Sequence, residues 1–226
     1  MRQIQPFSDE RQLARCVYCG GLPSTRDHVP SRVLLDQPFP ENLPNVPACE
    51  ACNASFSLDE EYVACLVDCV IVGSTDPSAV HRDNVSRILR ARPSLRFLTD
   101  EGKTTTASGT TWRIANDRVG NVVLKLARGH AAFELNEPQF ADPVSVSCLP
   151  LGTLSEGARA NFEELPQPSV FPEVGSRGMS RLVVGGLRTQ WVDVQPGRYR
   201  YAAIATDGVV VRFVLSEYLA CEVIWD

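Results

Sequence analysis

Two cysteine pairs lie near the start of the sequence, each with two residues between its members. The pairs are Cys16–Cys19 and Cys49–Cys52, with 29 residues between them. One C-x-x-C pair can form an edge of a metal tetrahedron, and four cysteine ligands make the closed, structural type of Zn²⁺ site. The spacing therefore predicts a structural zinc site. A redox dithiol or a disulfide framework is the alternative, but the pattern is doubled and nothing in the sequence suggests secretion.

Three polar residues lie where a zinc clamp would bring them together. Asp27 and His28 are adjacent between the two cysteine pairs, and Asn53 directly follows the last cysteine. Carboxylate and amide oxygens suit a hard divalent cation such as Mg²⁺ or Mn²⁺, and a neutral histidine suits the activation of a water molecule. These groups are the parts needed for metal-assisted hydrolysis of a phosphodiester.

The combined pattern of C-x-x-C, Asp-His-Val-Pro and C-x-x-C-Asn, over residues 16–62, resembles the HNH endonucleases. In that family a ββα-metal fold holds the catalytic ion, and a zinc knuckle often clamps its base. The resemblance implies that Asp27 and Asn53 bind the catalytic Mg²⁺ or Mn²⁺ and that His28 is the general base.

The middle asparagine of the family pattern has two candidates. Asn45 lies four residues before Cys49 and Asn42 lies seven before it; we favour Asn45, which would orient His28. The family often carries a lysine or histidine three or four residues after the final asparagine, whereas this chain has Phe56 and Ser57 there. A further metal or phosphate contact on the helix is therefore not expected at those two positions.

Composition is that of an ordinary soluble globular protein, with 44% hydrophobic and 22% charged residues in 226. Residues 1–15 contain no apolar run, and the most apolar stretch, residues 62–72, is too short to span a membrane. We therefore expect a cytoplasmic protein without a membrane segment. The four cysteines outside the predicted zinc site are expected to be small buried side chains: Cys65, Cys69, Cys148 and Cys221.

The net charge of −5 is unevenly distributed. Residues 36–80 carry eight acidic and no basic side chains, whereas residues 81–128 carry ten basic and four acidic ones. The negative total does not favour nucleic-acid binding, but a basic segment beside an acidic metal region could supply phosphate contacts. The resemblance implies a nucleic-acid partner, with DNA favoured. A helix predicted over residues 112–133 has a polar face that could contact phosphates or simply face solvent: Arg118, Asn121, Lys125 and Arg128.

The resemblance implies a zinc-clamped ββα-metal unit, and hydrophobic periodicity predicts that helices and a small antiparallel β-sheet follow it, so we expect an α+β protein. We divide it into an HNH-like unit (1–72), a helical segment (73–135) and a β-rich region without evident chemistry (136–226). Prolines predict a loop over 36–48, and Gly and Pro predict one over 151–178. Helices are expected from Asn53 to about residue 72, with Leu58 on its apolar face, and over 78–92; a loop or hairpin is expected over 99–111. Predicted strands cover 181–184, 190–194, 199–205, 209–215 and 220–225.

The sequence thus predicts a metal-dependent endonuclease that hydrolyses phosphodiester bonds. The alternative is a non-catalytic zinc knuckle that binds nucleic acid or protein. We favour the enzyme because a purely structural knuckle has no need of Asp27, His28 and Asn53 together.

Overall fold

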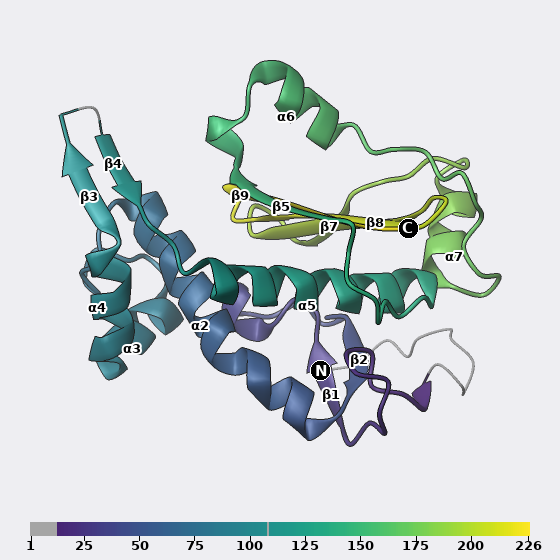
Figure 1. Cartoon of the computed structure of the whole chain (residues 1–226), viewed down its shortest axis with the longest axis horizontal. Coiled ribbons are helices and arrows are strands. Elements are labelled where there is room, and N and C mark those ends of the chain that lie inside the picture. The colour runs from purple at the N-terminus through teal and green to yellow at the C-terminus, as the bar shows by residue number, and fades with distance from the viewer. Residues whose placement is uncertain (1–12, 108) are drawn as a thin grey trace.

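The computed structural model describes residues 13–107 and 109–226, and in them the chain is a mixed α+β protein with antiparallel sheets, which confirms the α+β class of the prediction. Helix α5 (Asn116–Leu135) runs through the middle of the molecule (Figure 1). A five-stranded sheet packs on one side of α5, and the N-terminal hairpin and first long helix pack on its other side. The chain is therefore organised as two layers that share one helix.

The N-terminal layer begins with the antiparallel strands β1 (Thr25–His28) and β2 (Asn45–Ala48). The 3-10 helix η1 (Arg32–Leu34) lies in the connection between them, and the loop predicted over 36–48 ends earlier than expected because β2 takes its last four residues. Helix α2 (Glu50–Val72) follows directly. It begins three residues before the predicted start because the Cys49 thiol caps it, accepting the Cys52 N–H.

The remaining N-terminal elements are the short helices α3 (Asp83–Ala91) and α4 (Pro93–Glu101), and a hairpin of β3 (Lys103–Thr106) and β4 (Gly109–Trp112). The helix predicted over 78–92 starts at Asp83 instead. Pro93 ends α3 as expected but also opens α4, since a proline at the first helical position loses no hydrogen bond. The hairpin matches one of the two structures predicted for 99–111.

Two predictions about helix surfaces are wrong. Leu58, expected on the apolar face of α2, is 54% exposed. Lys125, expected on a polar face of the helix that is now α5, is only 1% exposed and belongs to the interior. The helix predicted over 112–133 also shifts along the chain, because Trp112 belongs to β4 and α5 starts at Asn116.

The C-terminal layer is an antiparallel sheet in the order β5-β9-β8-β7-β6. The predicted loop over 151–178 in fact contains a 3-10 helix (Leu151–Thr153) and helix α6 (Glu156–Glu163). The predicted strand 181–184 is the end of helix α7 (Arg177–Val184). Serine side chains start both helices: Ser155 accepts the Ala158 N–H and Ser176 accepts the Met179 N–H. The elements are β5 (Ser145–Pro150), η2 (Leu151–Thr153), α6 (Glu156–Glu163), α7 (Arg177–Val184), β6 (Val192–Gln195), β7 (Tyr199–Ala205), β8 (Val209–Leu215) and β9 (Leu219–Trp225).

Both faces of the central strand β8 are covered, so every residue in it is buried. Val211 and Phe213 join the main core on the α5 side. Val214 joins Phe162 of α6 in a second cluster on the opposite face. The main core also includes residues of α2 and α5, so the three predicted segments share one hydrophobic interior. Among the described residues, no helix combines the length and apolar character needed to cross a membrane.

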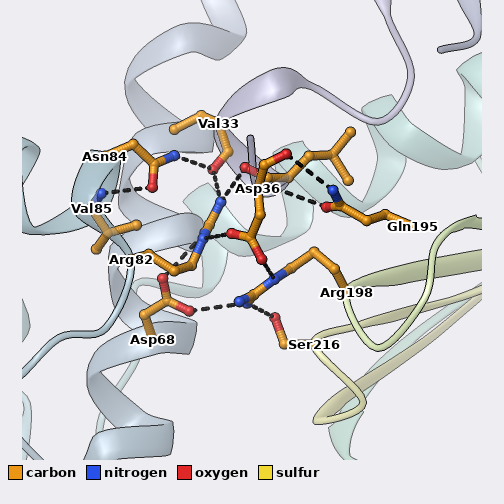
Figure 2. Close-up of polar contacts among 10 residues, drawn as sticks. Val33, Asp36, Asp68, Arg82, Asn84, Val85, Gln195, Arg198 and Ser216 are labelled. Carbon is orange, nitrogen blue, oxygen red and sulfur yellow. Dashed lines mark hydrogen bonds and ion pairs between the residues drawn. The ribbon is translucent and has the colours of Figure 1, made fainter. Parts of the chain in front are cut away.

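A partly buried ionic network also joins the two layers (Figure 2). Arg82, just before α3, donates to Asp36 Oδ1 at 2.6 Å and to Asp68 Oδ2 at 3.1 Å. Arg198, just before β7, donates to Asp36 Oδ2 at 3.0 Å and Asp68 Oδ1 at 3.3 Å. The amide of Gln195 pairs with the backbone N–H and C=O of Asp36, at 2.8 and 3.0 Å. Two acids and two arginines thus neutralise one another where the sheet meets the N-terminal layer.

Gly129 sets how closely α5 can approach the residue that follows β1. A Cβ at position 129 would lie 2.5 Å from Val29 Cγ2, whereas a Cβ at Gly120, in the same helix, would meet nothing within 4 Å. Gly129→Ala should therefore lower the free energy of unfolding by about 1–3 kcal/mol through overpacking. Gly120→Ala should raise it by roughly 0.5–1 kcal/mol, since alanine favours the helix. Urea unfolding of both variants tests this packing, and equal shifts in the same direction would contradict it.

Candidate metal centre and polar site

The four cysteines of the two C-x-x-C pairs lie together, as predicted. All four sulfur atoms are within 4.8 Å of one another, and the Cys19 and Cys49 sulfurs are 3.8 Å apart. A tetrahedral Zn²⁺ with Zn–S bonds of about 2.3 Å requires sulfurs about 3.8 Å apart, while a disulfide would hold them at about 2 Å. The cluster therefore has the donor set and spacing to hold a metal ion such as Zn²⁺.

Backbone contacts hold the first cysteine pair against β2. The Cys16 N–H donates to Gly21 O at 2.7 Å, and Gly20 takes a φ of 75°, which glycine adopts without strain. The Val17 N–H donates to Pro47 O at 3.1 Å. The second pair lies at the start of α2, where the Cys52 N–H is the main cause that lowers the pKa of Cys49 to about 7. A thiol that ionises easily at this place suits a metal ligand.

His28 and Asn45 are directly opposed across the β1–β2 pair. Side chains so placed lie on one face of the sheet with Cβ atoms about 5 Å apart. Asn45 is buried and accepts from Arg26 Nη1 at 3.0 Å, while its Nδ2 has no partner among the described residues. His28 Nδ1 is likewise buried without a described partner. Burial and the charge of Arg32 lower the pKa of His28, which keeps the half-buried ring neutral near pH 7.

Asp27 alternates with His28 along β1 and points to the opposite face, into the molecule. Its Oδ2 accepts from Tyr18 Oη at 2.7 Å and from Lys125 Nζ at 2.8 Å. Burial and the neighbouring Asp27 carboxylate raise the pKa of Tyr18, so its hydroxyl stays protonated and continues to donate. Asp27 Oδ1 makes no hydrogen bond to the described residues, and 9% of the side chain remains exposed.

Lys125 connects Asp27 to a second carboxylate. Its Nζ lies 2.5 Å from Glu60 Oε1 and 2.7 Å from Ser31 Oγ, and the Ser31 hydroxyl also contacts Glu60. The sequence analysis missed this cluster, since Lys125 was assigned to an exposed face and Glu60 was not singled out. One signal was present for Glu60: it lies seven residues after Asn53, two helical turns along the same face of α2.

Asn53 lies in the first turns of α2 with its amide against β1. Its Nδ2 donates to Thr25 Oγ1 at 3.2 Å and Arg26 O at 3.5 Å. Thr25 and Asp27 share a face of β1, so the Asn53 amide lies on the same side as the Asp27 carboxylate, and His28 lies on the other. Asn42, the alternative middle asparagine, is exposed in the turn before β2.

The helix position that carries lysine or histidine in the resembled family holds Phe56, which packs edge-on against Tyr18. Lys125 Nζ lies 5.8 Å from the centre of the Phe56 ring. A lysine ammonium is therefore present in this region, but α5 supplies it.

No protein-family model matches this chain, and neither the curated proteins nor the solved structures contain a match. Across residues 13–107 and 109–226, the four cysteines form the one cluster of three or more histidine, cysteine or acidic side chains with the spacing of a metal site. The candidate site rests on its own geometry.

The remaining cysteines provide a control for the metal centre. Cys65, Cys69 and Cys221 are buried and Cys148 is half-buried, with its sulfur 3.1 Å from that of Cys221.

The purified protein should carry one tightly bound zinc per chain in reducing buffer. Cys49→Ser should lose it and unfold the N-terminal layer, because a structural zinc contributes on the order of 10 kcal/mol to the folding of a small knuckle. Cys148→Ser should keep it. Metal analysis that finds no zinc in the wild-type protein, or a native Cys16–Cys19 disulfide, would refute this assignment.

Proposed function

We propose that this protein is a metal-dependent endonuclease of the HNH type, acting on nucleic acid, with DNA as the favoured substrate. The observation that carries the proposal is the opposition of His28 and Asn45 across the β1–β2 pair, each with a buried polar atom unpaired within the described residues. Native proteins rarely leave such atoms unpaired, and those that do are candidates for function. A half-buried neutral histidine also has the properties of a general base.

In the proposed mechanism His28 accepts a proton from a water molecule, whose oxygen then attacks the scissile phosphorus. The bond from phosphorus to the 3′-oxygen breaks, and the 3′-oxygen leaves with the electron pair. Asn45 faces His28 from the neighbouring strand.

Asp27 and Asn53 would hold a Mg²⁺ or Mn²⁺ ion, which would neutralise charge as it develops on the phosphate and the leaving oxygen. Each of these two side chains has one oxygen that could bind the ion. Asp27 Oδ1 and Asn53 Oδ1 make no hydrogen bond to the described residues, because the contacts of these side chains use Oδ2 and Nδ2. Hard oxygen donors of this kind match Mg²⁺ and Mn²⁺ rather than the cysteine-bound Zn²⁺.

The phosphate contacts, which the sequence placed on the polar face of α5, are assigned in this proposal to exposed arginines. On that face Lys125 is buried, Arg118 and Asn121 contact Asp59, and Arg128 donates to backbone carbonyls. Exposed arginines remain in α3, at Arg87 and Arg90, and beside the site. Charge attraction of this type predicts binding that weakens steeply as salt rises.

A non-catalytic zinc knuckle that binds nucleic acid or protein is the second candidate. It is favoured by the ion pair between Asp27 and Lys125, because the ammonium already neutralises the carboxylate that would hold the catalytic ion. This candidate predicts zinc and nucleic-acid or protein binding without cleavage. Metal-dependent nicking of plasmid DNA separates the two functions.

His28→Ala should keep the zinc, the fold and DNA binding, yet cut plasmid DNA about 100-fold more slowly or worse, the usual scale for loss of a general base. His81→Ala is the matched control, since His81 is exposed and distant in sequence, and it should cut normally. Asp27→Ala should lose the response to added Mg²⁺ or Mn²⁺. Nicking assays with Mg²⁺, Mn²⁺ or EDTA provide the measurement. If folded His28→Ala cuts at the wild-type rate, His28 is structural and the binding function replaces the enzyme.

A further inference from the structure

The ammonium of Lys125 has no capacity left for a substrate. It carries three N–H donors, and four oxygens lie within hydrogen-bond distance: Asp27 Oδ2, Glu60 Oε1 and Ser31 Oγ at 2.8, 2.5 and 2.7 Å, and His28 O at 3.4 Å. The side chain is 1% exposed. Lys125 therefore acts on its surroundings only through the groups it already binds.

Both contacts made to the Asp27 carboxylate involve the same oxygen atom. Tyr18 and Lys125 both bind Oδ2, from the loop of the first cysteine pair and from α5. Two donors on one oxygen fix the plane of the carboxylate and leave Oδ1 in a set direction. Carboxylates that bind metals are commonly oriented by hydrogen bonds of this kind to the oxygen that does not bind the ion.

We propose that Lys125 is a positioning residue for Asp27, and that α5, with the sheet packed behind it, is therefore part of the metal-binding site. This inference rests on the proposed function and deepens it, since it assigns the C-terminal layer a role in the chemistry of the N-terminal one. The N-terminal hairpin and α2 supply Asp27 and Asn53, but the orientation of Asp27 comes from a residue 98 positions later in the chain.

Charge balance explains why a lysine serves here. Asp27 and Glu60 carry two negative charges and Lys125 one positive charge, so the cluster has a net charge of −1. Two carboxylates this close would repel each other without the ammonium. With the ammonium in place, the remaining negative charge favours a cation at the free oxygen of Asp27.

The test compares two variants: Lys125→Met alone, and a double variant that combines Lys125→Met with Glu60→Gln. The double variant removes one charge of each sign, so the net charge of the cluster stays at −1. Lys103→Met, in β3, is the control and changes the other lysine of the chain. Zinc content reports the fold, a Mn²⁺ titration followed by electron paramagnetic resonance reports the cation site, and plasmid nicking reports activity. Both Lys125 variants should keep the zinc, need about 10-fold more Mn²⁺ for half-saturation and cut at least 10-fold more slowly.

A purely structural role for Lys125 makes a different prediction. The variants would then lose thermal stability while their Mn²⁺ half-saturation and cutting rate stayed at the wild-type values, and this result overturns the inference. If both Lys125 variants lose zinc and fold, Tyr18→Phe removes the other donor to the same oxygen, and unchanged Mn²⁺ binding in that variant also overturns it.

The two proposals fail in distinguishable ways. Wild-type protein that binds Mn²⁺ but does not cut disproves the nuclease, while the Mn²⁺ titration still decides the role of Lys125. Wild-type protein that cuts, together with a double variant that binds Mn²⁺ and cuts normally, overturns the role of Lys125 alone. Wild-type protein that binds no Mn²⁺ overturns both.

Discussion

The burial of α5 on two sides is the constraint on which the rest of this structure depends. One side packs on α2 and the β1–β2 pair, and the other packs on β7 and β8. Val122 and Leu126 are among its almost fully buried residues, and the glycine at position 129 allows the helix backbone to approach Val29. A helix covered on both sides gains most of its stability from tertiary packing, so neither layer is complete without the other.

Charged groups then fix how the layers are placed around that helix. Hydrophobic contact is not directional, whereas the Lys125 cluster and the Arg82–Arg198 network each require particular partners at particular distances. Breaking one partner of such a buried pair leaves an uncompensated charge, which typically costs about 3–5 kcal/mol. Both networks join residues far apart in the sequence, and they therefore disfavour alternative arrangements of the two layers.

Local sequence patterns were sufficient for the cysteine cluster and for most of the sheet. The doubled C-x-x-C spacing predicted the cysteine cluster, and period-two patterns gave the bounds of β7 and β8 without error, because these features are set by neighbouring residues. Local patterns failed for α6 and α7, where short capped helices occupy a stretch rich in glycine and proline. They also failed for Lys125, since the side chain is buried by partners 65 and 98 residues away that no helical periodicity records. The chemistry proposed for Asp27, His28 and Asn53 stays a prediction.

The position of α5 in the chain has a consequence for synthesis on the ribosome. The four cysteines of the cluster and the whole of α2 are made within the first 72 residues, whereas the sheet that covers the far side of α5 is finished only at Trp225. Domains form as units once their parts have been made, so the cysteine cluster can close early while α5 still lacks its second cover. Until β7 and β8 are in place, the apolar side of α5 that they cover faces water, and a chain that ends before them presents this helix to chaperones and proteases.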